Sequence, residues 1–435
     1  MTGESRGHEP LAPLRHRNFV FYMAARLFSG TAMTLLQAVM AWQVNLISGS
    51  THDAALNLGL LGLFRFFPAL GLSLLGGAVA DTYNRRNIVL AAQLLPVAAA
   101  LTLALATVGG WVSLALIFGL VVLVALGSAF ENPAGAALLP AIVPATEFTS
   151  AVTLSNSTRT LGFVTGPTIA GLIIAAAGVD AAYLAHLALI ATSLILIAMI
   201  RYRQPAGQRS AVSIAGIVEG VRFVRKRQVL LGAMTLDMFA VILGGATALL
   251  PIYATDILDV GALGYGLLQG SFEFGAFLMA IGLLARPPIV NTGRTLLISV
   301  ALFGAGTIVF GVSRWFPLSL AAYTFIGMAD QLSVVLRQTT IQLSTPDDLR
   351  GRVSSVSQIF IGASNQLGAL ESGLVAAATS ATFAVVSGGA GCLAVVGLVA
   401  SKLPDLRRYR ITDPAPKIED VQREAAAGLE RQPGE

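Results

Sequence analysis

The chain is poor in charge, cysteine and histidine. Only 12% of its 435 residues are charged, against roughly 25% in soluble domains. Its single cysteine, Cys392, lies in an apolar run, which excludes a disulfide framework and a cysteine metal site. The four histidines (His8, His16, His52 and His186) show no ligand spacing, and no nucleophile motif is present. We therefore expect no metal, no catalytic residue and no enzyme.

Two further signals are missing from the sequence. The first eighteen residues are polar and the first apolar segment is too long for a signal peptide, so we expect no cleaved leader. The glycine pairs at 244–245 and 388–389 lack the G-x-x-x-x-G-K-[ST] pattern of a nucleotide site. We expect these glycines to allow close helix packing instead, and we expect no ATP drive.

Long apolar runs are abundant. The chain is 55% apolar, with a mean hydropathy of +0.75, and this composition indicates lipid as the solvent. A bilayer is crossed by about 20 apolar residues, and twelve stretches meet that length: 19–47, 57–80, 88–108, 111–140, 152–177, 182–200, 229–253, 264–284, 295–312, 316–341, 353–377 and 382–401. We predict an all-α integral membrane protein with twelve transmembrane helices in two pseudo-symmetric six-helix bundles.

Polar segments divide the chain into five expected parts. These are a cytoplasmic N-terminus (1–18), a first bundle (19–200), a central loop with an amphipathic helix (201–228), a second bundle (229–402) and a disordered cytoplasmic tail (403–435). Arginines gather in the termini, the central loop and alternate short loops, whereas the opposite loops hold Arg314 as their only basic residue. This asymmetry predicts a multi-pass protein of the bacterial cytoplasmic (inner) membrane with both termini cytoplasmic. The net charge of +5 then reflects topology and contact with anionic lipids, not nucleic acid.

The two halves repeat each other weakly. At one offset of 202, four positions of the fifth span match the eleventh, and Gly59-Leu-Leu resembles Gly266-Leu-Leu. The four matches are Ser155 with Ser357, Gly166 with Gly368, Gly171 with Gly373 and Leu172 with Leu374. Duplicated six-helix halves predict such matches in corresponding spans.

A polar cluster follows the second span, with the sequence Gly77-x-x-x-Asp81-x-x-x-Arg85-Arg86. Small residues there let backbones approach, and opposite charges stand just outside the membrane. The pattern resembles the loop signature of the major facilitator superfamily. That resemblance implies a rocker-type transporter in which these residues form a cytoplasmic latch, and we expect the latch to stabilise the outward-facing state by bridging the helices that close the inner mouth.

The fifth span contains a second motif, Gly162-x-x-x-Gly166-Pro167-x-x-x-Gly171, with Arg159 one turn before it. The motif resembles that of drug:proton antiporters, and the segment from Asn132 to Pro144 is similar to enterobactin exporters and macrolide-efflux transporters. The resemblance implies proton-coupled efflux of a bulky amphipathic molecule, through siderophore export or multidrug resistance. It implies no cofactor beyond a proton gradient as energy source.

Ionised side chains within spans are the best candidates for mechanism, since each costs about 2.5–3.5 kcal/mol at a helix centre. Removal from water favours the neutral form of a carboxylic acid, so a buried acid is suited to load and release a proton. The proton-coupling candidates are Asp237, Glu273, Asp330 and Glu131. The substrate-cavity candidates are Arg26, Arg65, Phe64, Phe67 and Glu371.

These residues also have simpler interpretations. Arg26 is placed to extend to the inner interface as an anchor. Glu131 and Arg337 lie late in their spans and suit inter-helix salt bridges, and Arg159 suits pairing with an acid of the cytoplasmic gate. The aromatic residues around Arg65 are as well suited to face lipid as to line a cavity.

We predict a monomeric exporter whose partners are a small-molecule substrate, protons and membrane lipids, with no nucleic acid. An importer, a facilitator or a lipid flippase on the same fold is the alternative. A non-transporting membrane sensor or membrane enzyme is the alternative of another class.

Overall fold

The computed structural model describes residues 11–201, 214–287 and 289–412, without the side chains of some helical positions, among them Asp81. The expected cytoplasmic N-terminus and central loop are therefore described only in part. Of the tail expected to be disordered, residues 404–408 form the short helix α14 (Pro404–Arg408). The tail from residue 413 onward lies outside the described residues.

Five long helices form the first half of the molecule. They are α1 (Arg17–Ile47), α2 (Thr51–Thr82), α3 (Arg85–Gly109), α4 (Leu114–Leu138) and α5 (Phe148–Met199). Helix α5 contains two spans, because Gly178 adopts a non-helical backbone with φ of 92° between them. The Ser50 side chain accepts a hydrogen bond from the Asp53 amide at 3.2 Å and so caps the N-terminus of α2.

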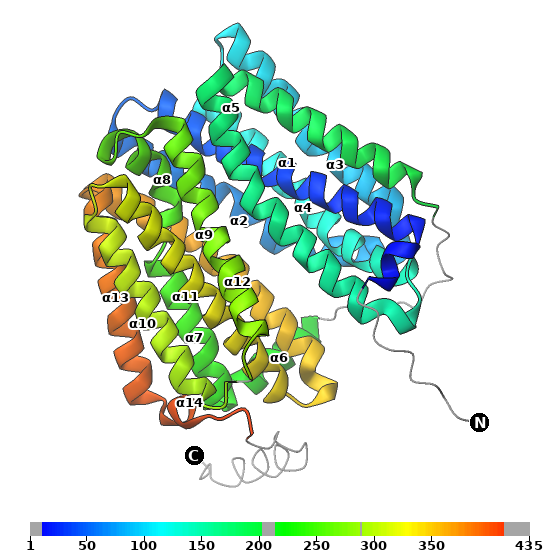
Figure 1. Cartoon of the computed structure of the whole chain (residues 1–435), viewed down its shortest axis with the longest axis vertical. Helices are drawn as coiled ribbons and strands as arrows, with labels where there is room; N and C mark the ends of the chain where they lie inside the picture. The colour runs from blue at the N-terminus through cyan, green and yellow to red at the C-terminus, as the bar shows by residue number, and fades with distance from the viewer. Residues whose placement is uncertain (1–10, 202–213, 288, 413–435) are drawn as a thin grey trace, which may run out of the picture.

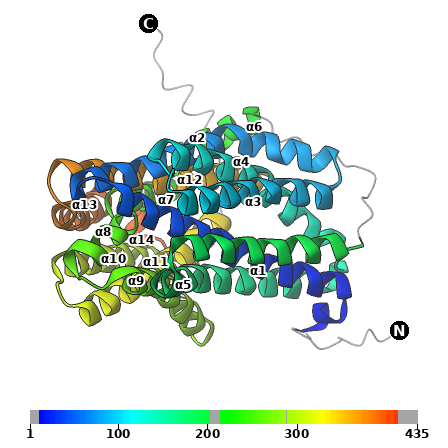
Figure 2. The ribbon, with the colours of Figure 1, turned by 90° about the horizontal axis from the view of Figure 1, so that it is seen from above.

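The second half repeats this plan after the amphipathic helix α6 (Ile214–Lys226). Helix α7 (Gln228–Leu243) continues through short turns, with α8 (Leu250–Ile252) among them, to Ile257. The remaining helices are α9 (Gly261–Leu284), α10 (Thr292–Val312), α11 (Phe316–Leu343), α12 (Asp347–Ala378) and α13 (Ala381–Lys402). Figures 1 and 2 show the helices of the two halves as two neighbouring bundles.

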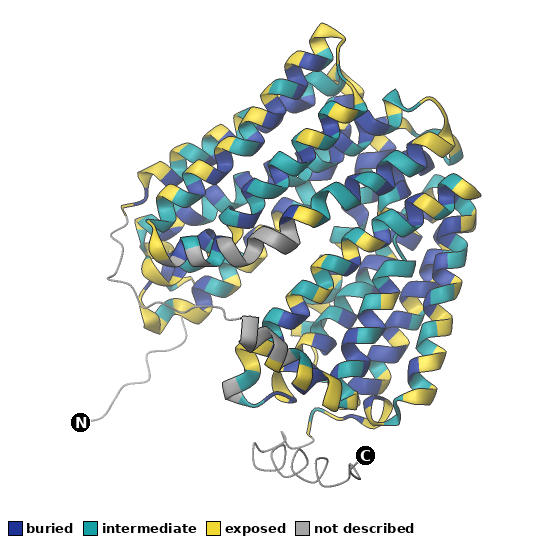
Figure 3. Ribbon diagram, turned by 180° about the vertical axis from the view of Figure 1, so that it is seen from behind, coloured by how far each residue is buried: buried dark blue, intermediate teal, exposed yellow. Residues whose placement is uncertain are grey.

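The described residues confirm an all-α membrane architecture. Within them, nine helical segments are long and apolar enough to cross a bilayer. One of the nine is the 55-residue segment that bends at Gly178, and α2 and α12, with 32 residues each, are not counted among the nine. The count of twelve spans stays a prediction. Buried positions run through the inside of both bundles, whereas exposed ones gather on outer faces and helix ends (Figure 3).

Two pairs of helices, α2 with α12 and α5 with α9, make most of the contact between the halves. Each pair includes a contact of glycine with glycine. A Cβ atom on Gly59 would lie 3.0 Å from the Cα of Gly373, and one on Gly171 would lie 2.7 Å from the Cα of Gly266. The repeat relates Gly59 to Gly266 and Gly171 to Gly373, so equivalent positions meet crosswise, as a two-fold relation between halves requires. We call these two contacts the glycine seams.

The ends of the bundles differ in how the halves meet. We call the end with the start of α1 and the end of α13 the terminal face, and the opposite end the distal face. Near the distal face Asn45 donates a hydrogen bond to Thr255 at 3.3 Å, and Thr51 donates one to Asp256 at 2.6 Å. The bundles lie closest there and diverge toward the terminal face (Figures 1 and 3).

Helix α6 packs against the second half. Its Phe223 and Val224 are buried in a cluster with residues of α7, α11 and α12. Glu219 forms an ion pair with Arg352 of α12. The described part of the central loop therefore contacts the second bundle.

Candidate functional site

A cavity of about 610 Å³ lies between the halves, and both contribute to its wall. Helices α1, α2 and α5 supply Thr34, Arg65 and Phe163, whereas α9 and α11 supply Glu273 and Asp330. A smaller cavity of about 260 Å³ shares Gln37, Arg65 and Gln366 with it and extends to Ser128 and Asn132 of α4. The larger cavity thus lies between two repeated bundles, and many transporters bind their substrates at such an interface.

The charges of the cavity are separated by sign. The cation Arg65 belongs to the first half, and the acids Glu273 and Asp330 belong to the second. Glu273 interacts electrostatically with Asp330 and with Arg159 of α5. Among the described residues, one terminal nitrogen of Arg65 and the side-chain oxygen of Gln269 are buried without a hydrogen-bond partner. Two residues of the wall, one from each half, therefore hold an unpaired polar atom.

Aromatic side chains form much of the remaining wall. Phe272 packs beside Tyr323 with ring centroids 5.5 Å apart, and the Tyr323 hydroxyl lies 2.7 Å from the Thr247 hydroxyl. The Tyr265 hydroxyl donates to the carbonyl of Ala38 at 3.2 Å, which joins α9 to α1. Flat faces of this kind suit aromatic or otherwise planar molecules.

Asp237 lies away from this cavity. Its carboxylate forms an ion pair with the guanidinium of Arg337, which joins α7 to α11. Asp237 is 8% exposed and Arg337 is 2% exposed. The proton-coupling candidates of the second half thus divide into two cavity acids and one acid in a buried ion pair.

Glu131 lies inside the first bundle. Gln93 of α3 donates a hydrogen bond to its carboxylate at 2.9 Å, and the Gln93 carbonyl oxygen accepts one from Ser193 at 3.3 Å. Arg26 lies against Gly135 of α4 and interacts electrostatically with Glu131. Neither Glu131 nor Arg26 is part of the cavity wall that the described residues form.

The other cavity candidates also lie elsewhere. Phe64 stacks on Phe118 of α4 with centroids 4.9 Å apart, and Phe67 is 65% exposed on the outside of α2. The Glu371 carboxylate accepts a hydrogen bond from its neighbour Ser372 at 3.3 Å. Of the substrate-cavity candidates, Arg65 is the one that the structure places in the wall.

The glycine motif of the fifth span packs α5 on two neighbours. A Cβ on Gly166 would lie 2.7 Å from the carbonyl oxygen of Thr31 in α1, and the Gly162 carbonyl accepts a hydrogen bond from Thr34 at 3.1 Å. Gly171 belongs to a glycine seam, and Pro167 lines the cavity. Arg159 is exposed, with its guanidinium 5.2 Å from the ring centroid of Phe163.

The arginines of the expected latch bind carbonyl groups at helix ends of their own half. Arg85 donates to the carbonyl of Ala137 at 2.8 Å, and Arg86 donates to that of Ile200 at 3.1 Å. Among the described residues, no atom from another element lies within 4 Å of the Cβ position of Gly77, so the structure shows no close helix approach at this glycine. The Asp81 side chain lies outside the described residues.

Several cavity residues were absent from the sequence-based candidates. They are the uncharged polar side chains Thr34, Gln37, Thr247, Gln269, Asn365 and Gln366. The three glutamines interrupt apolar spans, so the cost argument used for charges would have singled them out.

Comparisons with known proteins identify relatives of this chain among membrane transporters. A family model described as transmembrane secretion effector matches residues 8–429. The multidrug efflux pump Tap of Mycolicibacterium fortuitum is 29% identical over 429 residues, which cover 94% of this chain and 98% of that protein. The enterobactin exporter EntS of Shigella flexneri is 25% identical over 418 residues, 92% of this chain and 95% of that protein.

Solved structures share the fold. A bacterial homologue of the human lysosomal transporter Spinster, in an inward-facing and unoccupied conformation, aligns with a TM-score of 0.65 at 14% identity, covering 90% of this chain and 95% of that one. A POT family transporter in complex with 5-aminolevulinic acid aligns with a TM-score of 0.71 at 12% identity, covering 90% and 97%. The chain belongs to the transmembrane secretion effector family of the major facilitator superfamily, a family of transporters and not of enzymes.

Proposed function

We propose that the protein is a proton-coupled secondary exporter of a bulky amphipathic small molecule, a drug or a siderophore, that works by alternating access in the bacterial inner membrane. The efflux functions named for its relatives support export. The importer, the facilitator and the flippase remain rival outcomes of the test below.

The observation that carries the proposal is the separation of charge across the cavity. Arg65 lines the cavity from the first half, and Glu273 and Asp330 line it from the second, in a wall that also holds Phe163, Phe272 and Tyr323. Arg65 suits an anionic group of the substrate, and the two acids suit either a cationic group or protons. A proton and a substrate cation that compete for the same acids exchange for each other, which is the basis of antiport.

The orientation completes the proposal. Positive charge on the terminal face favours a cytoplasmic location of both termini. The divergence of the bundles toward that face then corresponds to an inward-facing state (Figure 1). In that state the latch arginines bind their own half, and the outward-facing state is the one in which they would bridge the inner mouth.

Everted membrane vesicles test this function. With ethidium as a cationic probe and enterobactin as an anionic one, we expect accumulation of at least one probe that depends on the pH gradient, together with proton release when that probe is added. Asp330→Asn and Glu273→Gln should each lower proton-coupled transport about tenfold or more, because a charged partner contributes about 1.5–3 kcal/mol. Asp259→Asn, an exposed acid on the distal face, should leave it unchanged.

The rivals give different results. Equilibration of a probe without any gradient indicates a facilitator, and gradient-driven uptake only in right-side-out vesicles indicates an importer. Transport of neither probe is the result expected of a lipid flippase. Full proton coupling in both cavity variants would show that Glu273 and Asp330 do not carry the protons.

A further inference from the structure

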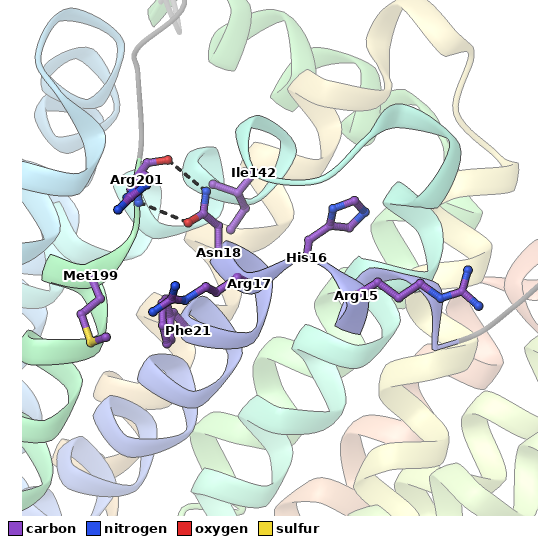
Figure 4. A pocket seen from close by; sticks show the side chains of 8 residues that line it. All are labelled: Arg15, His16, Arg17, Asn18, Phe21, Ile142, Met199 and Arg201. Carbon is purple, nitrogen blue, oxygen red and sulfur yellow. Dashed lines mark hydrogen bonds between the residues drawn. The ribbon is translucent and has the colours of Figure 1, made fainter.

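A second large cavity lies at the terminal face, apart from the central one. It measures about 560 Å³ and lies between the start of α1, the segment after α4 and the end of α5. We call it the rim pocket (Figure 4). None of its lining residues belongs to the central cavity or to the two motifs described above.

The rim pocket is basic. Arg15, Arg17 and Arg201 line it, together with His16. The carboxylate of Glu147 lies 2.9 Å from Nε2 of His16 and is therefore engaged by one of the lining residues. In Figure 4, Arg17 and Arg201 lie on the same side of the pocket, whereas Arg15 points away from them. Two guanidinium groups on one side of a pocket suit a phosphate group.

The pocket is also apolar along one wall. Phe21, Ile142 and Met199 line it beside the arginines, and Arg17 lies over the Phe21 ring at 5.2 Å from its centroid. The apolar surface continues outward along α5, where Met199 is 44% exposed and Ile195, one turn earlier, is 62% exposed. The arginines that suit an anionic head group therefore lie directly beside an apolar surface that suits acyl chains.

The pocket is held in shape by the backbone around it. The Asn18 side chain donates to the carbonyl of Arg201 at 3.0 Å and accepts from its amide at 3.2 Å. The preceding carbonyl, that of Ile200, accepts from Arg86 at 3.1 Å. The segment after α5 is thus fixed to α1 and to α3, so the site is formed before any ligand binds.

We propose that the rim pocket binds the head group of an anionic phospholipid, with its acyl chains along Met199 and Ile195. The site lies where the spans meet the membrane surface, and basic pockets between transmembrane helices at this depth bind anionic head groups. A soluble phosphate would use the arginines but not the apolar wall.

Native mass spectrometry of the full-length protein in detergent tests the proposal, with phosphatidylglycerol and phosphatidylcholine of identical acyl chains as probes. We expect a bound phosphatidylglycerol that phosphatidylcholine does not replace. A basic residue near the membrane contributes about 1 kcal/mol, so Arg17→Gln or Arg201→Gln should each weaken binding about fivefold. Arg17→Lys should retain most of the affinity.

The matched control is Arg294→Gln, which removes an exposed arginine at the start of α10, on the same face but outside the pocket. It should leave binding unchanged. An equal loss in this control, or equal binding of the two lipids by the unmodified protein, would overturn the proposal. Displacement of the lipid by inorganic phosphate at equal concentration would also overturn it. The comparison of lipids on the unmodified protein decides the matter even if a variant fails to fold.

Discussion

The ion pair between Asp237 and Arg337 gives the sharpest test of which intramembrane charges stabilise the fold and which take part in transport. Both residues are buried, and the pair joins α7 to α11 away from the cavity. Removal of one partner leaves an uncompensated buried charge, at a cost of about 3–5 kcal/mol. Each half of the molecule is comparable to a 150–250-residue domain, for which 1 kcal/mol shifts Tm by about 2–4 °C. We therefore expect Asp237→Asn to lower Tm by roughly 6–20 °C.

The double variant Asp237→Leu/Arg337→Leu removes both charges, and replacement of a whole buried pair by apolar side chains is often neutral. It should recover most of the lost Tm in thermal unfolding followed by tryptophan fluorescence. Asp259→Asn is the matched control, and as an exposed change it should fall within about 0.5 kcal/mol of the unmodified protein. The reasoning is refuted if Asp237→Asn keeps its Tm but loses proton dependence of transport, because Asp237 would then act as a coupling acid.

Two further predictions concern stability inside the bundles. Gly171→Ala should lower Tm, because the new Cβ would lie 2.6 Å from the carbonyl oxygen of Ala262 and overpacking costs about 1–3 kcal/mol. Gly77→Ala should raise Tm slightly, because the structure shows open space at this site and alanine is favoured over glycine in a helix by about 0.5–1 kcal/mol. Equal shifts of Tm in the two alanine variants would contradict the claim that the halves need glycine at position 171 to pack closely. Gln93→Leu should destabilise by about 1–3 kcal/mol, because Glu131 loses its buried donor; an unchanged Tm would show that this hydrogen bond contributes nothing.

The fold followed from the sequence because bilayer thickness and backbone hydrogen bonding leave few options for an apolar chain. Hydropathy located the helices to within a few residues, and the weak glycine matches correctly indicated repeated halves. The crosswise contacts of Gly59 with Gly373 and Gly171 with Gly266 give those matches a physical meaning. Each of these four glycines is a position where a side chain would separate the halves.

The cavity was harder to predict. A charged residue within a span indicates an energetic cost, but it does not indicate which way the side chain points. Asp237 and Asp330 were therefore equally good candidates in the sequence, although Asp237 pairs with Arg337 and Asp330 lines the cavity. The direction depends on how each helix is rotated about its axis, and tertiary packing sets that rotation. Phe64 and Phe67 illustrate this, because neighbouring turns of α2 place one ring against α4 and the other on the outer surface.

The glycine seams have a consequence for the energetics of opening. At the two seam contacts the backbones meet without intervening side chains, so movement there requires no change of rotamer. Elsewhere near the distal face the halves are joined by apolar packing, such as the stacking of Trp42 on Tyr265. Polar contacts add to this packing, namely those of Asn45 with Thr255, Thr51 with Asp256, and His52 with the carbonyl of Ala377 at 2.8 Å. At about 0.5–1.5 kcal/mol net for each hydrogen bond, these three polar contacts amount to roughly 1.5–4.5 kcal/mol. This polar contribution is therefore comparable to the few kcal/mol that separate the conformations of a two-state protein.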